Sequence, residues 1–150
     1  MAGVGIRITL EGGAGDELRE LMGRIDDLGP FFAAASETML DQTQRRFREQ
    51  RAPDGSPWAP LAATTIARRG SASPILERSG TLRGGIHAAP TPSAAIVRSL
   101  DLPYAAIHQA GGKAGRGRSV TIPARPYLGF GSEDVAELIE VAEAVILAGG

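Results

Sequence analysis

The residues that could perform acid–base or nucleophilic chemistry are few and far apart in this chain. Its two histidines, His87 and His108, stand beside no carboxylate pair, and the sequence contains no His-Glu-x-x-His or Gly-x-Ser-x-Gly motif. The 150 residues include no cysteine, which excludes disulfides, thiolate nucleophiles and cysteine-based zinc sites. We therefore predict no catalysis, no metal and no cofactor. For His108 we favour a packing or capping role over that of a general base in a hydrolase.

Arginine is the charged side chain suited to binding that the sequence contains in quantity, and it is concentrated in the middle of the chain. Residues 44–127 hold 13 Lys and Arg against 4 Asp and Glu, whereas the two flanks together hold 3 against 13. Such segregation is typical of a molecule with a basic and an acidic side, which suits head-to-tail contact between copies. The alternative is that the charges mix again when the chain folds.

Two basic segments are candidates for binding a partner. The segment at residues 112–119 places Lys113, Arg116 and Arg118 among glycines, but it does not follow a strand and open a helix as a phosphate-binding loop does. We interpret it as a flexible arm that orders on a partner, with a solvated hairpin tip or a DNA contact as alternatives. The arginine run at residues 45–51 contains a single aromatic residue, and the chain carries a net charge of −1. A solvated helix end with a few salt bridges is favoured there over nucleic-acid binding.

Two further residues combine a constrained backbone with a side chain suited to contacts. Trp58, the only tryptophan, follows a Pro-Asp-Gly-Ser-Pro turn. It is either an anchor in an interface or a side chain that pins its own loop onto the core. Arg125 precedes a proline, which biases its backbone towards extended geometry. A structural salt bridge is favoured for Arg125 over a contact with another subunit or with DNA.

The elements that must position these residues follow from hydrophobic spacing and from turn residues. Strict alternation predicts a strand at residues 4–10, and Asp16 and Ser132 are expected to N-cap helices. Helices are expected from residue 16 to the Gly-Pro at 29–30 and at residues 30–50, 61–69 and 132–147, with shorter helical pieces at 79–83 and 104–110. Strands are expected at 84–89 and 94–100 as a hairpin, and at 120–122 and 127–130.

This pattern predicts an α+β fold, with a small antiparallel β-sheet packed against two or three longer helices and a projecting flexible loop. The length suits a single domain spanning residues 1–150. The first residues contain no apolar core of a signal peptide, and no apolar run approaches the length of a membrane span. We therefore expect no membrane association.

An ordered row of short blocks in the middle of the chain resembles the phage virion morphogenesis family of Mu-like and tail-completion proteins. The blocks are Pro-Asp-Gly-Ser-Pro-Trp at residues 53–58, the segment at 61–69, Ile-Leu-Glu-Arg-Ser-Gly-Thr-Leu at 75–82, Tyr-Ala-Ala-Ile-His-Gln-Ala-Gly at 104–111 and Ile-Pro-Ala-Arg-Pro-Tyr-Leu-Gly at 122–129. Ala110 stands where an aromatic residue is expected in the family. The resemblance covers roughly residues 47–130 and, more weakly, the helices on either side.

The resemblance implies a structural virion protein at the head-proximal end of a phage tail, which completes or terminates the tail and joins it to the head. It implies a homo-oligomeric ring, expected to be a hexamer, with the tail tube protein and head–neck connector proteins as partners and possible contact with DNA in the lumen. The implied location is the virion tail or neck, and the host cytoplasm during assembly. A small nucleic-acid-binding protein using the central arginines is the alternative.

The interface candidates combine the arm, the aromatic and arginine positions of the blocks, and the polar face of the final helix. A ring is built from heterologous contacts, so opposite surfaces of one molecule must complement each other. The candidates are Trp58, Tyr104, His108, Lys113, Arg116, Arg118, Arg125, Tyr127, Glu137 and Glu140.

Overall fold

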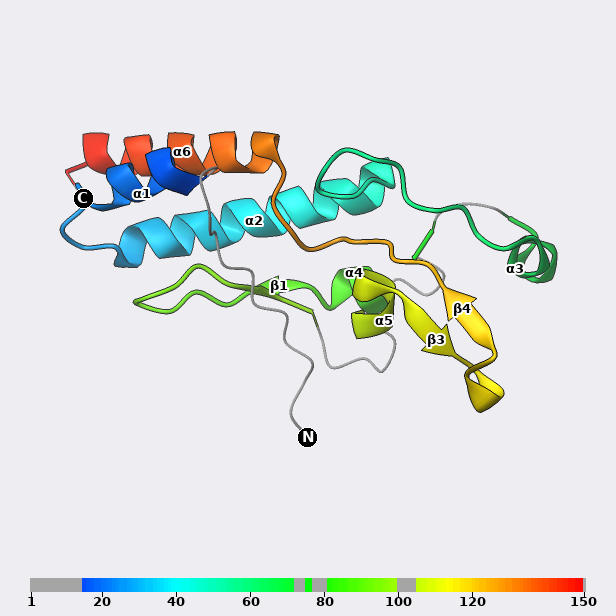
Figure 1. Cartoon of the computed structure of the whole chain (residues 1–150). Helices are drawn as coiled ribbons and strands as arrows, with labels where there is room; N and C mark the ends of the chain where they lie inside the picture. Colours follow the sequence, from blue (N-terminus) through cyan, green and yellow to red (C-terminus); the bar gives the residue numbers. More distant parts are fainter. Residues whose placement is uncertain (1–14, 72–74, 77–80, 100–104, 150) are drawn as a thin grey trace.

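A computed structural model describes residues 15–71, 75–76, 81–99 and 105–149. The strand expected at residues 4–10 lies outside these residues, as does Tyr104. In the described part, three helices form a layered body with a β-hairpin, and a second hairpin projects from it (Figure 1). The α+β prediction is confirmed.

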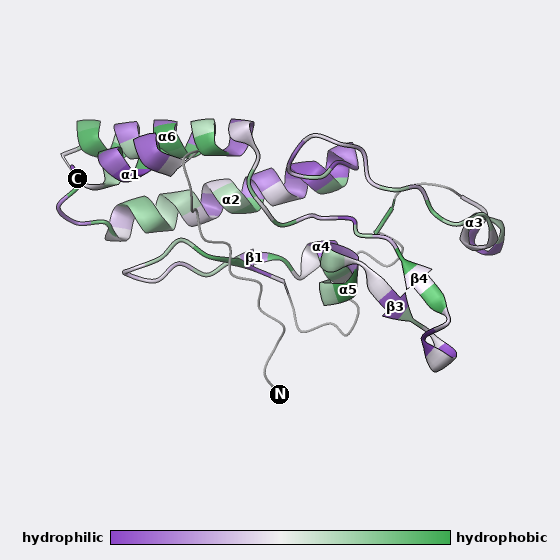
Figure 2. Cartoon of the chain, in the orientation of Figure 1, coloured by the Kyte–Doolittle hydropathy of each residue, from purple (hydrophilic) through white to green (hydrophobic). Residues whose placement is uncertain are grey.

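The longest helix, α2 (Gly29–Glu49), lies between a pair of helices on one side and a hairpin on the other (Figure 1). The pair consists of α1 (Asp16–Met22) and α6 (Ser132–Leu147). All three bury apolar side chains in one core, including Leu18 of α1, Phe31, Phe32 and Met39 of α2, and Leu138 of α6. Figure 2 shows the hydrophobic stretches along α2 and α6. The three- and four-residue spacing seen in the sequence is what places these side chains on shared faces.

The hairpin of β1 (His87–Ala88) and β2 (Val97–Arg98) packs against α2 from the side opposite α6 (Figure 1). The strands are antiparallel, with His87 opposite Arg98 and Ala88 opposite Val97. The Oγ of Ser36 on α2 accepts a hydrogen bond from the backbone N–H of Ile96 at 2.9 Å, which satisfies a buried donor. The predicted hairpin is confirmed, with strands shorter than expected.

Three short helices lie at the end of the body that carries the second hairpin. They are α3 (Ala63–Arg69), α4 (Thr81–Gly84) and α5 (Ala105–Ala110). The predicted helix at residues 61–69 ends where expected, because Gly70 adopts a left-handed conformation with φ 77° and caps it. The piece expected at 104–110 forms α5.

The segment expected to be a flexible loop contains regular structure. Residues 112–114 form β3 (Gly112–Ala114), which pairs antiparallel with β4 (Val120–Ile122), and the 3₁₀ turn η2 (Arg116–Arg118) closes the hairpin. The glycines of residues 112–119 suggested a flexible loop, whereas Gly115 and Gly117 supply the positive φ values of 81° and 67° that the tight turn of a hairpin needs. We call residues 111–122 the arm; it points away from the helical layer (Figure 1).

Three local predictions were wrong in detail. Residues 127–130 do not form a strand, because their backbone groups bond to side chains rather than to a neighbouring strand. Ser132 and Asp16 are the first residues of their helices rather than the N-caps, which are Gly131 and Gly15. At α6 the capping group is the carboxylate of Asp134, which accepts from the backbone N–H of Gly131 at 2.7 Å. Within the described residues, no helix is long and apolar enough to cross a membrane.

Candidate assembly surface

An aromatic cluster packs the end of α2 against the loop that carries Trp58 and the segment that follows the arm. The ring of Phe47, near the end of α2, meets Trp58 edge-on at a centroid distance of 5.3 Å and Tyr127 at 5.6 Å. Phe47 and Tyr127 are fully buried, and Trp58 is 5% exposed. The indole N–H of Trp58 also donates to the carbonyl of Pro126 at 2.7 Å. Trp58 and Tyr127 therefore pack in the core of their own chain, which for Trp58 agrees with the interpretation that it pins its own loop.

The segment after the arm is irregular backbone held by polar side chains. Gln109 at the end of α5 accepts from the N–H groups of Tyr127 and Leu128, each at 3.0 Å, and donates to the carbonyl of Leu128 at 2.6 Å. The hydroxyl of Tyr127 donates to the carbonyl of Ala105 at 3.0 Å. Hydrogen bonds from side chains thus take the place of the backbone hydrogen bonds that a neighbouring strand would have supplied. Such partners are needed because buried backbone groups must be hydrogen-bonded.

Arg125 is buried and binds backbone carbonyls rather than a carboxylate. Its Nε donates to the carbonyl of Ala59 at 2.7 Å and its Nη2 to that of Pro60 at 2.8 Å. Burial lowers the pKa of Arg125. The expected salt bridge is absent from the described residues, because the fork of the guanidinium instead matches two successive carbonyls of the loop after Trp58. Arg125 therefore ties the base of the arm to that loop.

His108 lies at the same contact between α5 and the end of the arm, which we call the first joint. Its carbonyl accepts from the N–H of Arg125 at 2.8 Å. Burial, and secondarily the charge of Arg125, lower the pKa of His108. This environment fits the expected packing role. Among the described residues, no group of three or more His, Asp or Glu is placed to hold a metal ion.

A second joint connects α2 to the start of α6 through ion pairs. The Nη2 of Arg46 pairs with Asp134, and its Nη1 donates to the carbonyl of Tyr127 at 3.0 Å. The side chains of Arg46 and Asp134 are only 7% and 10% exposed. Beside them Arg45 pairs with Glu137 at 2.8 Å, and this hydrogen bond lowers the pKa of Glu137. The salt bridges expected at this helix end are confirmed, whereas the expectation that the end is solvated was wrong for Arg46, because α6 covers it.

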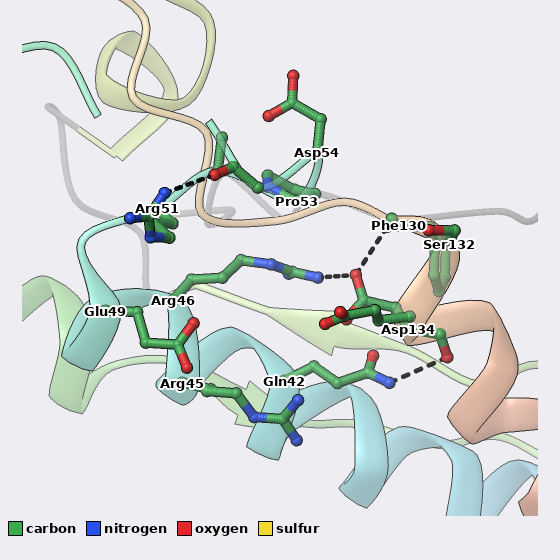
Figure 3. A pocket seen from close by; sticks show the side chains of 14 residues that line it. Gln42, Arg45, Arg46, Glu49, Arg51, Pro53, Asp54, Phe130, Ser132 and Asp134 are labelled. Carbon is green, nitrogen blue, oxygen red and sulfur yellow. Dashed lines mark hydrogen bonds and ion pairs between the residues drawn. The ribbon is translucent and has the colours of Figure 1, made fainter. Parts of the chain in front are cut away.

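The second joint borders an open pocket of about 390 Å³ between the end of α2 and the start of α6. Figure 3 shows the side chain of Arg46 pointing to that of Asp134. Asp134 also accepts a hydrogen bond from the backbone next to Phe130. Three exposed carboxylates line this pocket, and we call them the acidic rim: Glu49, Asp54 and Glu133. The Asp54 carboxylate accepts from both the hydroxyl and the N–H of Ser56, and these bonds lower its pKa.

The arm carries its charged residues in solvent. Lys113, Arg116 and Arg118 are exposed, and the Lys113 ammonium donates to Thr121 Oγ1 at 3.3 Å across the hairpin. Figure 2 shows the hydrophilic tip of the arm. Val120 is 50% exposed, an unusual position for a large apolar side chain in a strand. The arm is thus a basic surface with an apolar patch.

Folding mixes part of the segregated charge and leaves the rest apart. Arg45 and Arg46 of the basic segment pair with carboxylates of the acidic C-terminal flank. Glu133, Glu140 and Glu143 remain exposed on α6, whereas the cations of the arm stand on the projecting hairpin. Both interpretations of the charge pattern therefore hold, each for different residues.

Of the interface candidates, the arm residues and Glu140 are exposed, Glu137 is half-buried in its ion pair, and Trp58, Arg125 and Tyr127 are buried. Sequence reasoning missed Gln109 and Asp134, which organise the two joints. A carboxylate three residues after a glycine, in the first turn of an amphipathic helix, was the available signal for Asp134. Gln109 gave no signal beyond its place in the His-Gln-Ala-Gly block.

Comparison with known proteins agrees with the resemblance noted from the blocks. The model of the phage virion morphogenesis family matches residues 13–146. Over 133 residues the chain is 29% identical to tail completion protein S of Escherichia phage P2, covering 81% of this chain and 89% of that protein. It is 66% identical over 38 residues to Mu-like prophage FluMu G protein 2 of Haemophilus influenzae, a match that spans 25% of this chain and only 28% of that protein. No solved structure matches.

The family match spans nearly the whole chain, including both joints and the arm. The protein therefore belongs to the phage virion morphogenesis family. Its function lies in building phage tails and virions, in agreement with the expectation drawn from the blocks.

Proposed function

We propose that the protein completes the head-proximal end of a phage tail as a ring-forming, non-catalytic subunit. The observation that carries the proposal is the match to tail completion protein S of phage P2, which extends over 89% of that protein. The family assignment over residues 13–146 supports a role in virion assembly. Ring formation, a hexameric count and a position at the head-proximal end are part of the proposal.

The architecture suits a subunit that must present fixed contact surfaces. The buried pair of Arg46 and Asp134 locks the start of α6 onto α2, and Arg125 locks the arm to the loop after Trp58. A ring contact needs two different surfaces on one molecule. The projecting basic arm and the exposed carboxylates of α6, including Glu140, supply two such surfaces. The proposed partners are further copies of the chain, the tail tube protein and head–neck connector proteins.

The experiment that tests this function is a deletion in the phage or prophage that encodes the chain, followed by cryo-electron microscopy of the particles. We expect tails that lack heads or have irregular length, and restoration by the gene supplied from a plasmid. In wild-type particles, density for the chain should form a closed ring at the tail–head junction. Normal, infectious particles that lack the chain would refute the proposal.

The alternative function, nucleic-acid binding, has support from the exposed cations of the arm but from only two of the four arginines in the run at residues 45–51. Arg45 and Arg46 are both engaged by carboxylates, which removes them from a basic footprint. The two functions are separable by titrating the isolated protein with duplex DNA. Tight binding that weakens steeply with salt would favour the alternative.

A further inference from the structure

The arm is an incomplete structural unit as it stands in one chain. Its sheet consists of the strands β3 and β4 alone among the described residues, and residues 115–121 are all exposed. A two-stranded hairpin without a packed face is marginally stable in water. Val120 is half in solvent on this hairpin. The arm therefore gains stability from any surface that covers it.

The acidic rim is a surface on the same chain whose charge is opposite to that of the arm. After the internal pair of Arg46 with Asp134, and the pair of Arg45 with Glu137, the pocket lining retains Arg51 against the three carboxylates of the rim. It is hollow, so a long side chain can enter it, and Phe130 and Pro53 supply apolar lining. Glu140 is a further exposed carboxylate on α6 after Glu133, and it extends the acidic surface beyond the pocket.

We propose that the arm of one copy docks on the acidic rim of the next copy, with Arg116 or Arg118 entering the pocket between α2 and α6. The occupant is a second copy because the arm points away from its own helical layer (Figure 1) and because arm and rim carry opposite charges on different parts of one molecule. The contact is heterologous, so each copy uses one arm and one rim, and repetition closes a ring. This inference rests on the proposed ring function and names the contact that would build the ring.

A second copy is favoured over DNA as the occupant by the composition of the arm. It offers only three cations and an exposed valine, whereas a DNA-binding surface needs a wider basic footprint. Phosphates would leave Val120 without an apolar partner, whereas the pocket contains Phe130.

The first test uses the absence of native cysteine, which makes any disulfide an engineered one. The variant Arg118→Cys with Glu133→Cys is incorporated into particles, then treated with a mild oxidant or a short bismaleimide. We expect a ladder of covalent oligomers that ends at the ring size. Each single-cysteine variant should give no ladder. Incorporation of the double variant without a ladder would overturn the proposal.

The second test exploits the two-sided nature of the contact. One variant reverses the charge of the arm (Arg116→Glu, Arg118→Glu) and another reverses the charge of the rim (Glu49→Lys, Glu133→Lys). Neither should be recovered on tails when it is the sole copy, but an equal mixture should be, because each supplies the surface that the other needs. The matched control changes, Arg98→Glu and Glu37→Lys, lie on exposed positions of β2 and α2 and should leave assembly unchanged.

The outcomes separate this contact from the proposed function. Arm-reversed protein that assembles normally, or that loses only DNA binding, would overturn the contact while a ring in the wild-type particles kept the function. Wild-type protein that neither enters particles nor associates with itself would refute both. Circular dichroism of each variant checks that a loss of assembly is not a loss of folding.

Discussion

At the scale of single residues, the pair of Arg46 with Asp134 joins two helices where both side chains are almost closed to solvent. Arg46 brings a charge into a site that is almost closed to solvent, and burial lowers its pKa while the Asp134 carboxylate opposes that shift. The same carboxylate receives the N–H of Gly131, so it serves the arginine and the start of α6 together. One side chain thus couples the end of α2 to the first turn of α6.

We expect Asp134→Ala to lower the free energy of unfolding by about 3–5 kcal/mol, because it leaves a buried guanidinium without its counter-charge. The measurement is urea denaturation followed by circular dichroism. The double variant Arg46→Met with Asp134→Leu removes both charges and should recover a large part of the loss. If Asp134→Ala proved as stable as the wild type, the pair would not carry this joint.

His108 makes the stability of the fold depend on pH. Its pKa is lowered in the folded state, so the unfolded chain binds a proton more readily. Stability is therefore fully present above the ordinary histidine pKa of about 6.5 and is lost as the pH falls from there towards the folded pKa. Thermal melts across this acidic range should show the decline, and His108→Gln should flatten it. An unchanged decline in the variant would assign it to other groups.

At the scale of elements, the arm leaves the body at a glycine that no other residue can replace without movement. Gly111 has φ 74°, and a Cβ there would lie 2.9 Å from the backbone nitrogen of Ala124. Gly117 at the tip also has positive φ, but nothing lies within 4 Å of its Cβ position. The two positions therefore separate conformational strain from a steric clash.

We expect Gly117→Ala to cost about 1–2 kcal/mol, the strain of a left-handed alanine. Gly111→Ala should cost more, because the backbone of residue 124 must also shift and disturb the bonds of Arg125. Denaturation of both variants under the same conditions gives the comparison. Equal losses would mean that the close approach of residues 111 and 124 adds nothing.

The segment between the arm and α6 is organised by close contact rather than by regular structure. A Cβ on Gly131 would collide with the carbonyl of Pro53, and one on Gly129 would lie 2.7 Å from its Cγ. The Pro-Asp-Gly-Ser-Pro turn therefore sits directly against the entry to α6. This packing places the acidic rim, since Asp54 follows Pro53 and Glu133 follows the N-cap by two residues.

At the scale of the whole molecule, the exposed charges predict how assembly responds to salt. The arm and the acidic rim are in solvent, where added salt screens interactions beyond about 8 Å at physiological ionic strength. We expect self-association, or the retention of the chain on tails, to weaken as sodium chloride is raised. Sedimentation at several salt concentrations measures this.

The control for the salt experiment lies within the same chain. The buried pair of Arg46 with Asp134 is screened much less than exposed pairs, so the fold should persist over the same range. Association that is indifferent to salt would point to an apolar contact instead, for which Val120 of the arm, 50% exposed, and Leu147 at the end of α6, 88% exposed, are available.

The sequence alone determined the α+β class, the lengths of α2, α3 and α6, the β1–β2 hairpin and the family. These features depend on local spacing, on glycines after helix ends and on turn residues, all of which act between near neighbours in the chain. The row of blocks at residues 53–129 was enough to identify the family because its order and spacing are readable without contacts.

Only the tertiary structure decided which partners the charged side chains have and how deeply they are buried. Arg46 and Arg45 look alike in the sequence, yet one is buried and the other half-exposed, because α6 arrives from 88 residues away to cover the first. The same holds for Arg125, whose partners are the carbonyls of residues 59 and 60. Ion pairs and side-chain bonds to irregular backbone depend on long-range packing, which periodicity and turn chemistry do not encode.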